Sequence, residues 1–202
     1  MNAFDMPFSK TYGSRVSREA CVREEGVAGI PFGGEAVDQI RLEKVNYNNI
    51  RRILELRVAE EQASFVAANS ESMIEAYLTL AEGRPVFPFG IFRGEEAVGF
   101  LMIGYDYHDE DEHLERPGFV DGSYLLWRLM IDRAHQQKGY GRKAVRLVLD
   151  FMRTFPCGKA EYCWLSYEPE NRAARELYRS FGFKELQERP KGWDEIPAVL
   201  KL

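Results

Sequence analysis

A short glycine-containing segment, residues 136–141, has the composition of an anion-binding loop. Its sequence is Gln-Gln-Lys-Gly-Tyr-Gly, and the cationic residues Arg142 and Lys143 follow it directly. Glycines let the backbone curl so that successive N–H groups point at one spot, and the positive end of a following helix dipole adds to that field. The segment therefore predicts a cradle for a diphosphate.

The spacing of these glycines excludes two common phosphate-binding loops. The chain contains neither G-x-x-x-x-G-K-[ST], which cradles nucleoside triphosphates, nor G-x-G-x-x-G, which opens a dinucleotide-binding unit. The pattern present is Q-x-x-G-x-G.

The cradle needs a strand before it and a helix after it. Residues 124–131 form an apolar run broken only by Arg128, which predicts a buried strand at the centre of a sheet. After the loop, apolar residues recur at helical spacing and predict a helix over residues 141–155. These residues are Val145, Val148, Leu149 and Met152.

A second segment, residues 171–183, adds a further pattern. It contains Asn171, Ala174, Leu177 and Tyr178 and ends in Gly-Phe. The two segments together resemble the signatures of the GNAT acetyltransferases, Q-x-x-G-x-G and N-x-x-A-x-x-L-Y-x-x-x-G-F, in the same order along the chain.

The GNAT resemblance implies acetyl-CoA as co-substrate, with its pyrophosphate on the glycine loop. It also implies that Asn171 contacts the pantetheine arm and that the Tyr178 hydroxyl lies near the sulfur. The cofactor-binding residues expected on this basis are Leu129, Met130, Ile131, Gln136, Gln137, Lys138, Gly139, Tyr140, Gly141, Arg142, Lys143, Asn171, Ala174 and Tyr178.

A narrower resemblance points to the bacterial spermine/spermidine acetyltransferase branch. It implies a small-molecule amine acceptor, a polyamine or diamine, and a homodimer, although no periodic apolar seam shows the dimer. An extension at residues 1–37 and an acidic loop at residues 108–122 have no counterpart in that pattern. The resemblance rests on residues 56–58, 61–62, 65–67, 69, 76–77 and 127–128.

Amine acetylation requires proton transfer. An alkyl ammonium titrates near the lysine value of about 10.4, so a general base or a water chain must remove a proton before the amine attacks. Glu61 is the first candidate, since it lies in the substrate-facing segment of the resemblance. Tyr178 is expected to protonate the leaving thiolate, and N–H groups near Met130 and Ile131 to stabilise the oxyanion. Alternative bases are Glu60, Asp106 and Asp121.

Other functions stay open from the sequence. The same fold and loop would support acetylation of a protein N-terminus, a lysine or an aminoglycoside. A sensor that binds acetyl-CoA without turnover is the alternative from another class, although it would have no chemical need for Tyr178 and a base. No metal is expected, because the histidines form no ligand pattern; they are His108, His113 and His135.

The remaining periodicities predict a single α/β (α+β) domain over residues 38–202, preceded by a breaker-rich extension at residues 1–37. We expect a GNAT fold: a mixed, mostly antiparallel sheet of six or seven strands, flanked by about four helices and splayed at the CoA site. Asn48 or Asn49 should cap the first helix, and Asn69 or Ser70 the second. Strands are predicted at residues 40–45, 86–92, 97–107, 124–131, 160–167, 183–186 and 198–202.

The composition of the chain argues against some classes of binding partner. A net charge of -5 argues against nucleic-acid binding and suits a cationic ligand. No apolar run approaches the roughly 18 residues of a membrane span, and the three cysteines form no CxxC pair. We therefore expect a cytoplasmic protein with no membrane partner.

Overall fold

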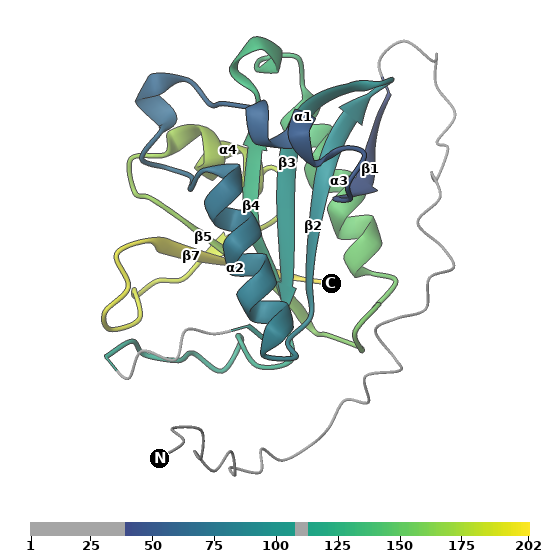
Figure 1. Ribbon diagram of the computed structural model, residues 1–202. Coiled ribbons are helices and arrows are strands. Elements are labelled where there is room, and N and C mark those ends of the chain that lie inside the picture. Colours follow the sequence, from purple (N-terminus) through teal and green to yellow (C-terminus); the bar gives the residue numbers. More distant parts are fainter. Residues whose placement is uncertain (1–38, 108–112) are drawn as a thin grey trace, which may run out of the picture.

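The computed structural model describes residues 39–107 and 113–202. The expectation for residues 1–37 thus lies outside the described residues, as does part of the acidic loop. The described part contains seven strands in one mixed sheet and four α-helices (Figure 1). The predicted fold class is confirmed.

The sheet has the order β1-β2-β3-β4-β5-β7-β6, and its neighbours are antiparallel except β4 and β5. β4 is therefore the central strand, as its apolar run predicted. The strands are β1 (Ile40–Lys44), β2 (Val86–Arg93), β3 (Glu96–Tyr105), β4 (Tyr124–Ile131), β5 (Tyr162–Tyr167), β6 (Lys184–Glu185) and β7 (Ile196–Lys201).

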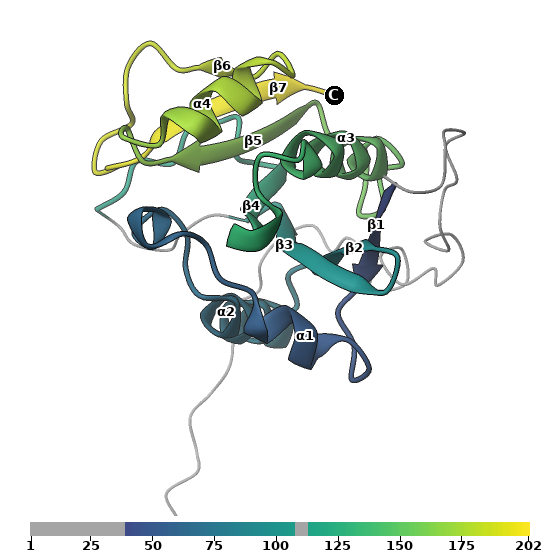
Figure 2. The same cartoon turned by 90° about the horizontal axis from the view of Figure 1, so that it is seen from above.

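Helices cover both faces of the sheet (Figure 2). α1 (Ile50–Glu55) and α2 (Asn69–Ala81) lie on one face, where Ile53 and Ala76 pack against Phe100 and Met130. α3 (Tyr140–Met152) and α4 (Arg172–Arg179) lie on the other. Short 3-10 helices, η1 (Glu60–Gln62) and η2 (Arg133–His135), complete the described helical elements.

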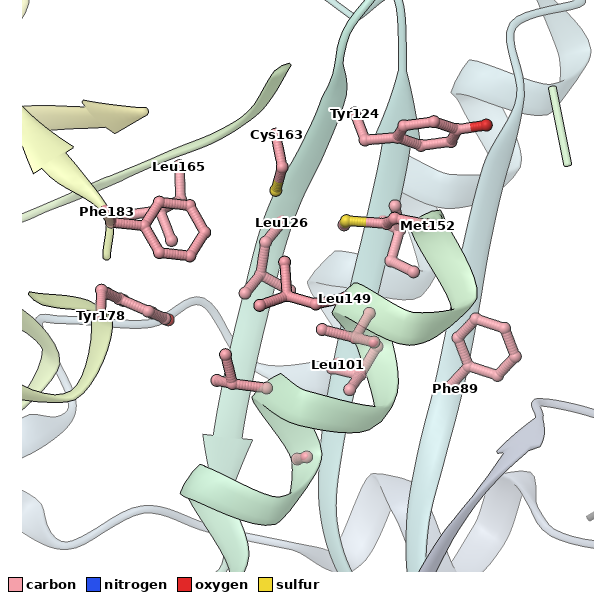
Figure 3. Packing of buried hydrophobic residues seen from close by; sticks show 14 of the residues in the cluster. Phe89, Leu101, Tyr124, Leu126, Leu149, Met152, Cys163, Leu165, Tyr178 and Phe183 are labelled. Carbon is pink, nitrogen blue, oxygen red and sulfur yellow. The ribbon is translucent and has the colours of Figure 1, made fainter. Parts of the chain in front are cut away.

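The larger core lies between α3 and the sheet. Leu149 and Met152 of α3 pack over Leu101 and Leu126, as the helical periodicity predicted (Figure 3). This packing fixes α3, and with it the loop at its N-terminus, against the central strand.

The predicted N-cap position holds for α1, where Asn49 is the N-cap residue but makes no side-chain bond into the helix, and is wrong for α2, whose N-cap is Ala68. The Asn49 side chain accepts a hydrogen bond from the Asn46 N–H, outside helix α1, at 2.8 Å. Asn69 is already inside α2, and its buried amide donates to the Ile53 carbonyl at 2.8 Å. Both side chains therefore tie neighbouring segments together instead of closing helix ends, a tertiary use that local sequence patterns do not show.

Candidate active site

The sheet opens on one side of β4. β4 and β5 pair only at Tyr124–Cys163 and Leu125–Trp164, so the later part of β4 has no partner on that side. A bulge that places Trp127 as an extra residue opposite β3 bends the strand at the same level. The splayed central strands were expected, and the backbone N–H and C=O groups of the open edge are available to an extended ligand.

The glycine loop, residues 136–141, runs from the end of η2 into the first turn of α3. Gln137 and Gly139 both adopt positive φ angles, 59° and 75°, and α3 begins at Tyr140. Left-handed residues interspersed in such a turn direct successive N–H groups to one point, which is the geometry of an anion nest. The helix N-terminus adds positive potential at the same place, so the loop fits a diphosphate.

The loop is held to its surroundings by side chains. The Gln136 amide donates to the Ile131 carbonyl at 3.0 Å and to Gln62 Oε1 at 2.6 Å. The Tyr140 ring is buried, and its hydroxyl accepts a hydrogen bond from Arg93 at 3.2 Å. Tyr140 therefore offers a ligand only its backbone N–H, while its side chain anchors the loop.

Cations surround the loop on its solvent side. The Lys138 ammonium donates to the Ala134 carbonyl at 2.8 Å, and Arg142 donates to Ser180 Oγ at 2.9 Å. The ammonium of Lys143 lies over the Tyr140 ring, 5.7 Å from its centroid. These contacts place three positively charged side chains beside the nest.

Asn171 lies at the start of α4 and on the pocket wall. Its Oδ1 accepts a hydrogen bond from the Ala174 N–H at 3.0 Å, which caps the helix. Asn171, Ala174, Tyr178 and Leu129 all line one pocket of about 510 Å³. Loop residues 136–143, together with Met130 and Ile131, lie outside that pocket wall.

Tyr178 reaches from α4 toward β4 (Figure 3). Only 8% of the residue is exposed, and its ring packs against Tyr167 and Phe183. Within residues 39–107 and 113–202, no group accepts a hydrogen bond from its hydroxyl. Burial, and then the charges of neighbouring groups, raise the pKa of the phenol well above its usual range. Tyr178 thus presents a neutral phenol at the pocket wall.

The pocket wall combines aromatic rings with carboxylates. Its two arginines are each paired with a carboxylate: Arg128 with Glu75 at 3.0 Å, and Arg116 with Asp121. The aromatic residues of the wall include Tyr107, Trp127, Trp164 and Trp193. The carboxylates of the wall are Glu75, Glu115, Asp194 and Glu195.

Two loops meet to close one side of the pocket. The Glu115 N–H donates to the Lys191 carbonyl at 2.9 Å, and the Lys191 N–H donates to the Glu115 carboxylate at 2.7 Å. The Trp193 indole donates to the Glu115 carbonyl at 2.8 Å. The described part of the acidic loop, residues 113–122, therefore forms one wall of the pocket, because these bonds hold it to the loop before β7.

Glu61, the predicted base, is exposed on η1 and is not among the residues of the pocket wall. Two of the alternatives hold structure together: Asp106 accepts from the Gly122 N–H at 2.8 Å, and Asp121 pairs with Arg116. Glu60 is exposed beside Glu61. The role of Glu61 stays a prediction.

Sequence reasoning missed the carboxylates and tryptophans that line the pocket. Glu75, Glu195, Trp164 and Trp193 come from α2, β5 and the loop before β7, and none belongs to a recognisable spacing. Pro190 and Gly192 beside Trp193 indicate a loop in the sequence, but they give no information about its contacts.

The described residues contain no group of three or more potential metal ligands. The Nε2 atom of His135 lies 3.4 Å from a carboxylate oxygen of Glu96. No helix in residues 39–107 or 113–202 is long and apolar enough to cross a membrane.

Comparison with known proteins agrees with this geometry. Residues 50–183 match the Acetyltransferase (GNAT) family. The spermine/spermidine N(1)-acetyltransferase of Bacillus subtilis (strain 168) is 28% identical over 146 residues, which cover 72% of this chain and 88% of that protein. A probable spermine N(1)-acetyltransferase of Bacillus subtilis subsp. natto (strain BEST195) matches with the same identity and coverage.

Solved structures share the fold. PaiA N-acetyltransferase from Thermoplasma acidophilum in complex with coenzyme A has a TM-score of 0.54 at 14% identity, over 81% of this chain and 99% of that one. The structure of AAC(6')-Ib in complex with ribostamycin and coenzyme A has a TM-score of 0.62 at 18% identity, over 81% of this chain and 94% of that one. With its family match over most of the described domain, the chain belongs to the acetyltransferase (GNAT) family and is an acetyl-CoA-dependent N-acetyltransferase.

Proposed function

We propose that the acceptor is a small cationic amine, with a polyamine or diamine as the preferred class. The observation that carries this proposal is the pocket wall, which sets four carboxylates among aromatic rings beside the Tyr178 hydroxyl. Two of those carboxylates, Asp194 and Glu195, have no cationic partner among the described ion pairs. Such a wall attracts polycations and contacts their methylene chains, and aromatic faces also bind ammonium groups.

In the proposed reaction, acetyl-CoA supplies the acyl group as a thioester. The nest at Gln137 and Gly139 binds its diphosphate, and the open edge of β4 holds the pantetheine arm. N–H groups near Met130 and Ile131 stabilise negative charge on the carbonyl oxygen during attack. Tyr178 then protonates the departing thiolate, a role that its raised pKa supports because the phenol keeps its proton at neutral pH. No metal ion is needed.

The base is a carboxylate on this proposal. The sequence resemblance nominates Glu61, and its position outside the pocket wall requires a water chain between it and the amine.

Polyamine acceptors also agree with the names of the Bacillus relatives. An aminoglycoside is the second candidate, because it is likewise a polycation that an acidic pocket would attract.

The substrate class is tested by initial rates of CoA release with an amine panel. The panel contains spermine, spermidine, putrescine, a monoamine of matched length, kanamycin and a lysine peptide. We expect the highest kcat/KM with polyamines, at least about tenfold above the monoamine, since a second ammonium can pair with another carboxylate of the pocket wall. Preference for the lysine peptide or the monoamine would contradict a polycation site.

A further inference from the structure

The carboxylates of the pocket wall differ in their exposure and in whether a cation already pairs with them. Glu75 is paired with Arg128 at 3.0 Å, so its charge is compensated. Glu115 is exposed at the rim and accepts the Lys191 N–H. Asp194 is exposed. Glu195 is partly buried, and no cation pairs with it among the described ion pairs. It is thus the sheltered, uncompensated carboxylate of this wall.

Glu195 is held in place by the sheet. It directly precedes β7, whose residues Ile196 and Pro197 pair with Tyr167 and Ser166 of β5. Its carboxylate accepts a hydrogen bond from the Ser166 hydroxyl, and both residues line the pocket. A carboxylate fixed by a strand pair and a hydrogen bond has a defined position, as a group that must meet a reacting atom requires.

Glu195 and Tyr178 line the same pocket. The negative charge of Glu195 is among the causes that raise the pKa of the Tyr178 phenol, after burial itself and the neighbouring Cys163 and Tyr167. Tyr178, a residue that is nine-tenths buried and whose hydroxyl has no hydrogen-bond partner in the described chain, lines this pocket. A carboxylate and a phenol therefore border one space, the arrangement of a base and an acid.

The surroundings of Glu195 favour a cation. Burial raises the pKa of the Glu168 carboxyl, and the charges of Glu195, Glu170 and Asp194 raise it further. These like charges repel one another, and no cation in the described residues pairs with Glu195 to relieve the repulsion. An ammonium bound at Glu195 would relieve it.

We infer that Glu195, held by Ser166, binds the reacting ammonium of the acceptor and accepts its proton. This inference rests on the proposed function and assigns to Glu195 the role that the sequence resemblance gave to Glu61. The ammonium gives its first proton to the Glu195 carboxylate, and the freed lone pair forms the C–N bond to the acetyl carbon. The C–S bond then breaks, and the thiolate takes the Tyr178 proton. The acylated nitrogen returns its second proton to Tyr178, and Glu195 releases the first to solvent.

The test compares Glu195→Gln with two matched variants, Asp194→Asn and Glu61→Gln. Each replaces one carboxylate by its amide; Asp194 is the sequence neighbour on the same wall, and Glu61 lies outside it. We expect Glu195→Gln to lower kcat/KM for the amine by about 100-fold at neutral pH, as for loss of a general base. The KM for acetyl-CoA should stay unchanged, and both comparison variants should lose far less.

The pH profile separates a base from a structural residue. The loss of kcat/KM in Glu195→Gln should become smaller as pH rises toward the ordinary alkyl-ammonium pKa of about 10.4, because the amine then loses its proton to solvent. Ser166→Ala keeps the carboxylate but removes its hydrogen bond, so it should give a smaller loss with the same pH trend. A loss of kcat/KM in Glu195→Gln that is the same at every pH would overturn the inference.

Two further outcomes are distinguishable. If the unmodified enzyme is active on polyamines and Glu195→Gln matches it at neutral pH, or Glu61→Gln shows the large deficit instead, the inference is wrong while the proposed function stands. If the unmodified enzyme binds acetyl-CoA but acetylates no amine of the panel, both fail together.

Discussion

Replacing Tyr178 with phenylalanine should lower kcat by about 100-fold, because the leaving thiolate loses its proton donor. The substitution keeps the ring that packs against Tyr167 and Phe183, so we expect little change in thermal stability. The KM for acetyl-CoA should change little, since the hydroxyl acts on the leaving group. Initial rates of CoA release at saturating substrates measure the effect.

Tyr167→Phe is the matched control. Tyr167 is also buried, lines the same pocket and stacks on Tyr178, but its hydroxyl donates to Glu185 at 2.6 Å. Its loss should therefore cost stability and leave kcat nearly intact. Equal losses of kcat in the two variants would contradict a chemical role for the Tyr178 hydroxyl.

The pH dependence of the unmodified enzyme gives a second check on Tyr178. The phenol keeps its proton to a higher pH because burial and nearby negative charge raise its pKa. A Tyr178 that titrated at the ordinary tyrosine value of about 10 would remove activity as pH rose through that value. We expect no such loss of kcat near that pH, and an alkaline limb centred there would be at odds with the buried phenol.

The second large effect is expected at the glycine loop. Gly139 has a φ of 75°, and a β-branched residue is strained in this conformation. Gly139→Val should therefore reshape the nest and weaken acetyl-CoA binding by about 30- to 100-fold, equivalent to one or two charge-assisted hydrogen bonds to the diphosphate. Isothermal titration with acetyl-CoA measures this loss directly.

Gly94→Val separates the loss of the nest from backbone strain. Gly94 lies in the turn between β2 and β3 with a φ of 56°, and at both glycines an added Cβ would meet no atom within 4 Å. Both variants should lose similar stability. Only Gly139→Val should lose affinity for acetyl-CoA, and an equal loss in Gly94→Val would show that the effect is global.

The proposed cofactor residues could be nominated from the sequence because each group of them lies in one local segment. The proposed diphosphate nest is one turn between η2 and α3, and its geometry depends on Gly139 at a fixed position. Asn171 caps the short helix that carries Tyr178, so the helix sets the spacing between the two residues. A single chain segment therefore carries the information for each part of the cofactor site.

The acceptor side could not be predicted in the same way. Glu195 meets Ser166 only through the pairing of β5 with β7, and Glu115 meets Lys191 across two loops. Such contacts depend on loop paths and long-range pairing, which leave no periodicity in the sequence. For the same reason, Asn69 could be placed near a helix start but not recognised as a buried bridge to Ile53.

The apolar periodicity of the sequence predicted the buried face of a helix correctly for α3 but not for α2. The α3 periodicity marked the residues that pack on the sheet. On α2, by contrast, the apolar residues Ile74, Tyr77, Leu78 and Leu80 are between 54% and 70% exposed. Apolar spacing predicted that this helix exists, but not which of its faces meets the sheet, because Ser72 and Thr79 occupy buried positions instead.

The most direct test of acetyl transfer follows a labelled acetyl group from acetyl-CoA into a polyamine. We expect the label to appear in the amine in a one-to-one ratio with free CoA thiol, at a rate that saturates with both substrates. Thiol release without label in any amine, or saturable acetyl-CoA binding with no release, would contradict the assignment of the pocket as an amine acceptor site.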